Sequence, residues 1–175
     1  TGRHYNAAGT VGYSFLGDAI SFEAAPARAG QADSGNDGIV PTTWADGAQG
    51  GLVTATIANR AGCLIGWVDW QGDGSFGEAD DQVLSMRTVG LGANAVQFPI
   101  PAGTFTGNGG NRTLTARFRL VPDWDSDGEC TDQPTVQPGG AVFGGEVEDY
   151  TWVFDAEGSP LQPVSYSLFL PLVVR

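Results

Sequence analysis

The sequence predicts an all-β fold, and within that class an antiparallel β-sandwich of the jelly-roll or immunoglobulin-like type. Short segments alternate between apolar and polar residues with the period of a strand, and clusters of Gly, Pro, Asn and Asp separate them. No helical period continues for more than about two turns. The chain of 175 residues also contains 27 glycines and 10 prolines, which supply the many turns that such a fold requires.

The clearest strand is the segment 112–121, in which apolar and polar residues alternate strictly. Its apolar face consists of Leu114, Ala116, Phe118 and Leu120, and its polar face includes Arg117 and Arg119. The other expected strands are equally short, rich in β-branched or aromatic residues and bounded by turn residues. In chain order they are 10–16, 51–58, 63–70, 95–100 and 148–155.

One domain accounts for most of the chain. Residues 1–155 are expected to form the sandwich, residues 156–163 a Gly- and Pro-containing linker, and residues 164–175 a C-terminal strand. The alternate apolar residues of this last strand share one face, which is too hydrophobic to remain in water. They are Tyr166, Leu168, Leu170, Leu172 and Val174.

This C-terminal strand has two possible locations. It completes the sheet of its own domain, or it fills a groove in a neighbouring copy and so builds a homo-oligomer or a homopolymer. Pro171 removes one backbone donor, which suits an edge or inserted strand. No apolar run approaches the roughly 20 residues of a transmembrane helix. The N-terminus lacks a signal-like segment, as expected of a mature chain whose leader has been removed.

The charge of the chain argues against one class of partner. The formal net charge is −12, and nucleic acid is not expected, because phosphate contacts require clustered Lys and Arg. The carboxylates repel one another in a compact body, and either bound cations or hydration alone would relieve that repulsion.

The two cysteines, Cys63 and Cys130, are expected to form a disulfide in an oxidising compartment. Such a bridge would close a long loop and stabilise the fold by roughly 4 kcal/mol on the chain-entropy estimate. It would also draw the two acidic regions described below close together. Two buried thiols are the alternative, and a zinc site is not expected, since His4 is the single histidine and no CxxC occurs.

The segment 69–80 has the spacing of a calcium-binding loop. Carboxylate or amide side chains fall at positions 1, 3, 5 and 12, and Gly74 at position 6 permits the sharp turn. Ca²⁺ accepts such oxygen ligands with flexible geometry. A solvated polar turn is the alternative. The candidate ligands of this main site are Asp69, Gln71, Asp73, Ser75 and Asp80.

A second acidic segment repeats the spacing with Asp123, Asp125 and Asp127, followed by Gly128. Its twelfth position is a proline, so closure of a calcium site would come from elsewhere, for example from Asp132. A third segment, 33–38, contains Asp33, Asn36 and Asp37, and there a turn is the better interpretation.

Three motifs in order, "CLIGWVDWQGDGSFGEADD", "RTLTARFRL" and "GGEVEDYTWVF", resemble the GEVED domain family of secreted bacterial proteins. The resemblance covers residues 33–154, with the acidic segment 33–40 preceding the motifs. It implies a β-rich extracellular module without an established catalytic role. Gln71 stands where the family usually has Asn, and the two cysteines are not part of its signature.

The acids of the last motif have two interpretations. Glu146 and Glu148 share one face of a strand, and Glu146 and Asp149 are weak candidates for calcium ligands. The alternative is structural, with the carboxylates bonded to backbone amides or to arginines such as Arg117 and Arg119.

No catalytic residues are expected, because no nucleophile with a base and no signature of a poised acid pair is evident. The expected function is that of a non-catalytic, extracellular or cell-surface structural subunit, stabilised by Ca²⁺ and joined to its neighbours by C-terminal strand addition. The alternative is a calcium-dependent carbohydrate-binding or adhesion module. In that case Trp70 and Trp124 would be exposed for stacking on surface glycans, whereas Trp67 and Trp152 are expected in the core.

Overall fold

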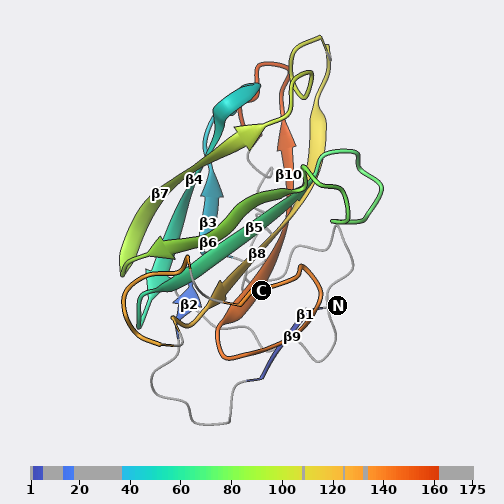
Figure 1. Ribbon diagram of the computed structural model, residues 1–175. Helices are drawn as coiled ribbons and strands as arrows, with labels where there is room; N and C mark the ends of the chain where they lie inside the picture. The colour runs from blue at the N-terminus through green and yellow to red at the C-terminus, as the bar shows by residue number, and fades with distance from the viewer. Residues whose placement is uncertain are drawn as a thin grey trace, which may run out of the picture.

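Figure 1 shows the computed structural model, which describes residues 2–5, 14–17, 37–107, 109–123, 125–131 and 134–161. These residues form strands and turns but no helix, and so include none that could span a membrane. The strand pairs among them are antiparallel except for β1 (Gly2–Tyr5) and β9 (Gly140–Phe143), which run parallel. The prediction of an all-β, antiparallel fold is therefore confirmed.

The first sheet contains four strands. In spatial order they are β10 (Glu146–Phe154), β8 (Arg112–Val121), β5 (Gly62–Asp69) and β6 (Gln82–Val89). β8 has the predicted bounds, and its predicted apolar face lies in the main hydrophobic core. β10 pairs with β8 along its whole length.

The second sheet is built around β4 (Gly47–Ala58). One edge of β4 pairs with β2 (Phe15–Leu16) and then with β3 (Ile39–Pro41). The other edge pairs with β7 (Gly92–Ile100). A tight turn at residues 90–91 connects β6 of the first sheet to β7 of the second.

β6 is absent from the strands that the sequence predicts, because its residues do not alternate cleanly. Its pairing with β5 shifts register twice, on either side of Gly66. Met86 within β6 adopts a positive φ of 41°. Such bulges break the period of two by which strands are recognised in a sequence.

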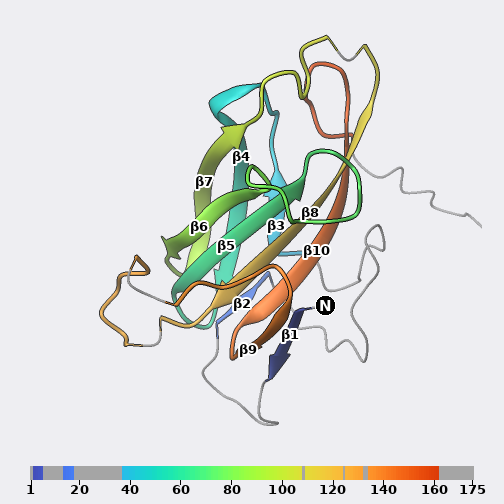
Figure 2. The same ribbon diagram turned by 45° about the vertical axis from the view of Figure 1, so that its right-hand side comes forward.

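Figure 2 shows the two sheets facing one another, and the buried side chains between them form a single main core. Trp44 lies at its centre, fully buried, with the Phe98 ring of β7 at 5.2 Å and the Phe154 ring of β10 at 4.5 Å between centroids. Aromatic side chains of both sheets thus contact one indole. This two-layer packing is that expected of a sandwich, while the jelly-roll or immunoglobulin-like type stays a prediction.

β5 is buried on both faces. Its even-numbered apolar residues, Leu64 and Val68, enter the main core. Its odd-numbered residues lie on the opposite face, in a second hydrophobic cluster that is covered by the segment 122–139. That cluster consists of Cys63, Ile65, Trp67, Val121, Cys130 and Val136. The Cys63–Cys130 disulfide, with a Cα–Cα distance of 5.6 Å, fastens the covering segment to β5 and confirms the predicted pairing.

The first residues of the expected linker belong to the domain. The N–H of Asp155 donates to the carbonyl of Ser159, and the N–H of Leu161 donates to that of Val153, so the chain turns back along β10. Gly158 forms the turn with a φ of 78°, and a Cβ there would lie 1.9 Å from the carbonyl oxygen of Trp44. Gly and Pro here mark a tight turn rather than a spacer. Residues 162–163 and the expected strand 164–175 lie outside the described residues.

Removal of the disulfide should lower the free energy of unfolding by about 4 kcal/mol, the chain-entropy estimate for a sequence separation of 67 residues. The test is urea unfolding of the Cys63→Ala/Cys130→Ala variant beside the oxidised wild type. A reducing agent should lower the stability of the wild type to that of the variant and leave the variant unchanged. Equal stabilities of the variant and the oxidised wild type would contradict this expectation.

Candidate metal sites and motif side chains

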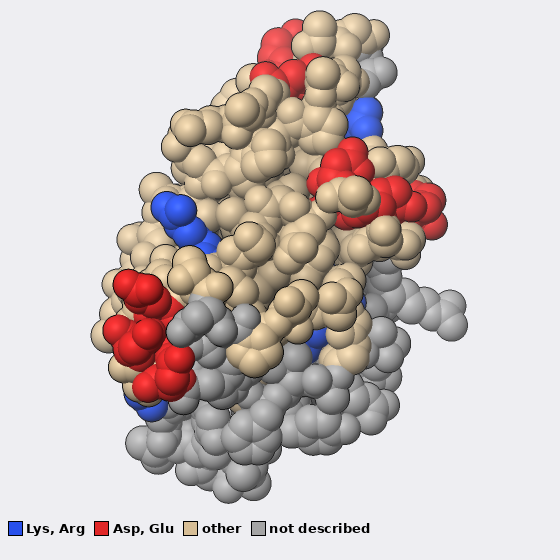
Figure 3. All heavy atoms as spheres, in the orientation of Figure 1, with Lys and Arg blue, Asp and Glu red and all other residues tan. Residues whose placement is uncertain are grey.

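Two acidic loops follow two strands of the first sheet. Loop 70–81 connects β5 to β6, and loop 122–139 connects β8 to β9. Figure 3 shows two separate acidic patches over these loops, one at the right and one at the lower left. The expectation that the disulfide draws the loops together is wrong. Cys63 lies near the start of β5 and Asp69 at its end, about 20 Å further along the strand.

Loop 70–81 begins with backbone amides gathered around the carboxylate of Asp69. Asp69 Oδ1 accepts hydrogen bonds from the N–H groups of Gly72, at 2.6 Å, and Asp73, at 3.2 Å. Its Oδ2 accepts from the N–H of Gly74 at 2.8 Å. Gly72 and Gly74 have φ values of 73° and 81°, which this turn requires and glycine readily adopts. Asp73 in turn accepts from the N–H of Ser75 at 2.8 Å.

Loop 122–139 begins with the same geometry. Asp123 accepts from the N–H groups of Ser126 at 3.0 Å and Gly128 at 2.8 Å, and Asp127 accepts from the N–H of Glu129 at 2.8 Å. Ser126 and Gly128 have φ values of 61° and 87°, like the two glycines of the first loop. The shared spacing D-W-x-x-D-G therefore forms the same turn twice.

The loops differ in how their carboxylates converge. One oxygen each of Asp123, Asp125 and Asp127 lies within 4.8 Å of the others, and no other such group of His, Cys, Asp or Glu occurs in the described part of the chain. In the first loop the middle position is the amide of Gln71, whose Nε2 lies 3.5 Å from Asp80 Oδ1. Gln71 and Asp80, at positions 3 and 12 of the expected calcium loop, are thus neighbours. The carboxylates of Asp69, Asp73 and Asp80, however, do not form one acidic cluster.

Asp81 is a buried acid that the calcium-loop spacing does not single out, because it follows position 12. Its side chain is fully buried, and Oδ2 accepts from the N–H of Glu78 at 3.0 Å. Oδ1 has no hydrogen-bond partner among the described residues. Burial first, and then the neighbouring Glu78 side chain, raise the pKa of Asp81 to about 6. The backbone carbonyl of Asp81 accepts from the N–H of Val68, which seats the end of the loop on β5.

Trp70 is buried, contrary to the expectation that it is exposed. Only 4% of it is accessible, and its indole N–H donates to the carbonyl of Asp80 at 2.9 Å. It follows directly after the doubly buried strand β5 and extends the main core toward Trp44. Trp67 and Trp152 pack against hydrophobic clusters as expected. Trp124 lies outside the described residues, as do Asp33, Asn36 and Asp132.

The acids of the last motif hold separate segments onto β10. Glu148 is 1% exposed, and its Oε1 accepts from the backbone N–H groups of Asp37 at 3.1 Å and Gly38 at 3.3 Å. Its Oε2 accepts from the hydroxyl of Tyr150 at 2.5 Å, and that hydroxyl accepts from the N–H of Ile39 at 2.8 Å. Two motif side chains thus fix the start of β3.

Glu146 and Asp149, the weak metal candidates, take part in structural bonds. Glu146 Oε2 accepts from the N–H of Leu16 at 2.6 Å, which attaches β2 to the first sheet. Asp149 forms a two-point ion pair with Arg117, with both N–O distances at 2.6 Å. These contacts correspond to the structural interpretation of the motif.

The arginines of β8 hold the returning chain against the outer face of the sheet. Arg117 also donates to the carbonyl of Pro138 at 2.9 Å. Arg119 is fully buried and donates to the carbonyls of Gln137, Gly139 and Gly140. Its burial, and then the neighbouring Arg117, lower the pKa of Arg119 to about 10. Carbonyl oxygens therefore accept the hydrogen bonds of a buried guanidinium that the strand pattern alone places on a polar face.

The pKa of Glu148 makes the fold sensitive to pH. Burial raises this pKa from 4.5 to about 7, while hydrogen bonds from Tyr150, Asp37 and Gly38 oppose the rise. Between these two values the folded chain retains a proton that the unfolded chain has released, so the stabilisation is complete below pH 4.5 and is lost as pH rises through about 7. The shift corresponds to about 3 kcal/mol.

Glu148→Gln removes this titration, so the pH dependence of its unfolding free energy should be flatter than that of the wild type by about 3 kcal/mol between about pH 4 and 8. Urea unfolding at a series of pH values measures both curves. General charge repulsion affects the two chains almost equally, which makes the difference between the curves specific to Glu148. Parallel curves would show that Glu148 titrates as a solvent-exposed acid does.

The matched motifs lie on β5, β8 and β10 and on the loops between them. No curated protein and no solved structure matches the chain. The GEVED domain family matches residues 64–153, just over half of the 175 residues, and the match includes both acidic loops and all of the three motifs except Cys63 and Phe154 at their outer ends. The chain therefore belongs to the GEVED domain family.

Proposed function

We propose that the chain is a non-catalytic structural subunit of an extracellular, cell-surface assembly. Its acidic loops bind Ca²⁺, and residues 164–175 join it to the next subunit by strand addition. The observation that carries the proposal is that the motif side chains are engaged inside the domain. Glu148 and Asp149 bond to the chain's own amides and to Arg117, as expected of a module whose purpose is to keep its shape.

The non-catalytic role is supported by the environment of Glu148. A carboxyl group with a pKa of about 7 suits a general acid or base. However, Glu148 is almost fully buried, and both of its oxygens already accept hydrogen bonds from Asp37, Gly38 and Tyr150. A substrate would have to displace these structural contacts to reach it.

Calcium is supported most strongly in loop 122–139. Three carboxylates converge there on an exposed turn, and hard oxygen donors of this kind suit Ca²⁺. The net charge of −12 also favours neutralisation by cations. Loop 70–81 has the same turn geometry around Asp69, and the side-chain oxygen of Gln71 is a ligand type that Ca²⁺ accepts, so we propose it as the second site.

The extracellular location is supported by the disulfide, because such bonds persist in oxidising compartments, and by the family membership. The alternative, a carbohydrate-binding or adhesion module, loses one of its two expected stacking residues, since Trp70 is buried. We therefore favour the structural role.

Ca²⁺ should raise the free energy of unfolding, by about 2.7 kcal/mol when the free ion is at 100 times its dissociation constant. Thermal unfolding in millimolar Ca²⁺ and in chelator measures the effect. Asp125→Asn/Asp127→Asn should remove the share that belongs to loop 122–139, whereas Glu157→Gln, an exposed acid outside both loops, should remove none. Identical unfolding curves of the wild type with and without chelator would refute the calcium part of the proposal.

Residues 164–175 should be required for assembly. We expect the full-length chain to form long species, visible by light scattering and electron microscopy, and the chain without 164–175 to stay monomeric. Ser165→Ala/Ser167→Ala, which leaves the apolar face of the segment unchanged, is the matched control and should assemble normally. A wild-type chain that remains monomeric at high concentration would refute the polymer.

A further inference from the structure

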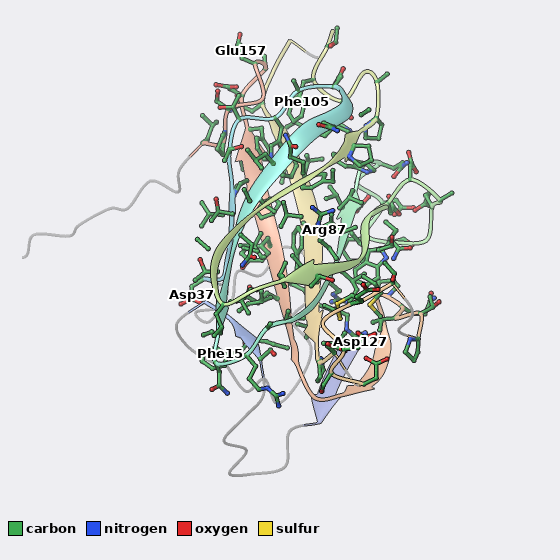
Figure 4. The ribbon with its side chains drawn as sticks, turned by 60° about the vertical axis from the view of Figure 1, so that its left-hand side comes forward. Phe15, Asp37, Arg87, Phe105, Asp127 and Glu157 are labelled. Carbon is green, nitrogen blue, oxygen red and sulfur yellow. A yellow bond between two sulfur atoms is a disulfide. The ribbon has the colours of Figure 1, made fainter. Side chains whose placement is uncertain are left out.

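β7 has a long edge that no described strand covers. It pairs with β4 along one edge only, and its nine residues carry no charge. The residues of β7 whose side chains are exposed alternate along the strand and include Ala93, Ala95, Gln97 and Pro99. Figure 4 views the molecule with β7 and β6 in front, and Figure 3 shows little charge along β7 at the upper left.

The bonds of β4 show which amides of β7 face outward. The N–H of Thr56 donates to the carbonyl of Gly38, so the even-numbered residues of β4 bond toward β3. Its odd-numbered residues therefore bond toward β7, where their register partners are even-numbered. This leaves the N–H groups of Ala93, Ala95 and Gln97 directed away from the sheet.

Three other described edges are less suited to strand addition. On β3 the N–H of Ile39 is bonded to Tyr150, and Pro41 has no N–H. β6 is bulged at Met86, and the end of β10 already pairs with Leu161. A long, regular and uncharged edge is a template for an added strand, and β7 is the edge that meets this description.

The apolar strand 164–175 fits this edge in one direction. The residues of its expected apolar face, from Tyr166 to Val174, are even-numbered, so their N–H groups share one edge of the strand and Pro171 lies on the other. In a parallel pair, the residues of the added strand that hydrogen-bond to β7 have their side chains on the face opposite to the exposed side chains of β7. Parallel addition therefore places the apolar side chains on the face of the sheet that meets the core. It also directs the strand edge that lacks the N–H of Pro171 away from β7. Antiparallel addition with the same face inward would place Pro171 against β7.

The chain is too short to make this contact with its own β7. A parallel strand must enter at the Gly92 end of β7, about 26 Å from the Ile100 end. The turn at Gly158 bonds to Trp44, close to Gly47, which is the register partner of Ile100. The two residues 162–163 extend at most about 7 Å.

We propose that the outer edge of β7 accepts residues 164–175 of a second copy of this chain as a parallel strand. The proposal rests on the proposed function for the existence of the assembly, and it adds the acceptor and the direction. Each subunit gives one strand and receives one, so the contact is heterologous and continues into a filament.

The test uses two full-length variants, each with one half of the contact disabled. Ala95→Pro removes an outward N–H without touching the ladder to β4, and Ala95→Val is its matched control. Leu168→Asp/Leu170→Asp disables the donor strand. Neither disabled variant should assemble alone, whereas their mixture should give 1:1 dimers and nothing longer, as measured by light scattering. The Ala95→Val chain should assemble like the wild type.

These outcomes separate the two proposals. If the wild type forms filaments and Ala95→Pro forms them equally well, the edge assignment fails and the filament function stands. If the wild type stays monomeric, both fail. Circular dichroism and the melting temperature establish whether Ala95→Pro is folded, and the next experiment decides the edge without that substitution.

A synthetic peptide of residues 164–175, labelled with a nitroxide at its N-terminus, is added to the Leu168→Asp/Leu170→Asp chain. Amide exchange should become about tenfold slower at Ala93, Ala95 and Gln97 and stay unchanged at Val96, which is already bonded to β4. Line broadening by the nitroxide should be strongest at the Gly92 end of β7. Unchanged exchange at the three outward amides, or broadening centred on the Ile100 end, would overturn the proposal.

Discussion

The buried carboxyl group of Glu148 is the contact on which the arrangement of the two sheets depends. It belongs to β10 in the first sheet, and its bonds reach the amides of Asp37 and Gly38, which lead into β3 of the second. Tyr150 extends the contact to Ile39. Unpaired buried donors cost about 1–3 kcal/mol each, so loss of this one side chain would leave several uncompensated groups inside the fold.

Carboxylates have the same structural role elsewhere in the domain. Asp46 accepts from the N–H groups of Gly103, Phe105 and Thr106, and Asp155 accepts from that of Ser159. Asp69 and Asp123 gather the amides of the two acidic loops in the same manner. Much of the acidity of this chain is therefore used in turns that would otherwise have unsatisfied amides. In the described residues Asp123, Asp125 and Asp127 combine this role with convergence of one oxygen each, and this cluster is the one proposed above to bind a cation.

The extent to which the sequence predicts this structure varies with the local environment. β8 was predictable residue by residue, because one of its faces meets the core and alternation follows directly. β6 was not, since its bulges remove that alternation. The cysteine pairing followed from their number. Its consequence for the loops was wrongly predicted, although the expected strand 63–70 already placed Cys63 at the opposite end from Asp69.

Trp70 and Asp81 show the same limit at the candidate site. Acidic neighbours in the sequence suggest exposure for Trp70, yet the neighbouring strand carries it into the core. Asp81 lies outside the spacing that identifies calcium loops, and its burial comes from the seating of the loop on β5. The spacing of Asp123, Asp125 and Asp127 was sufficient to place three acids together, because a tight turn fixes neighbours without help from the rest of the fold.

The burial of the outer face of β5 depends in part on the oxidation of the two cysteines. Segment 122–139 shields Ile65 and Trp67, and the disulfide is its covalent attachment there. In a chain that has not been oxidised, the described contacts that remain are hydrogen bonds from Arg117 and Arg119 and the packing of Val136, and their loss would expose an aromatic, apolar strip. Exposed apolar surface of this kind favours aggregation, so the redox state of the two cysteines bears on how well the chain stays dissolved.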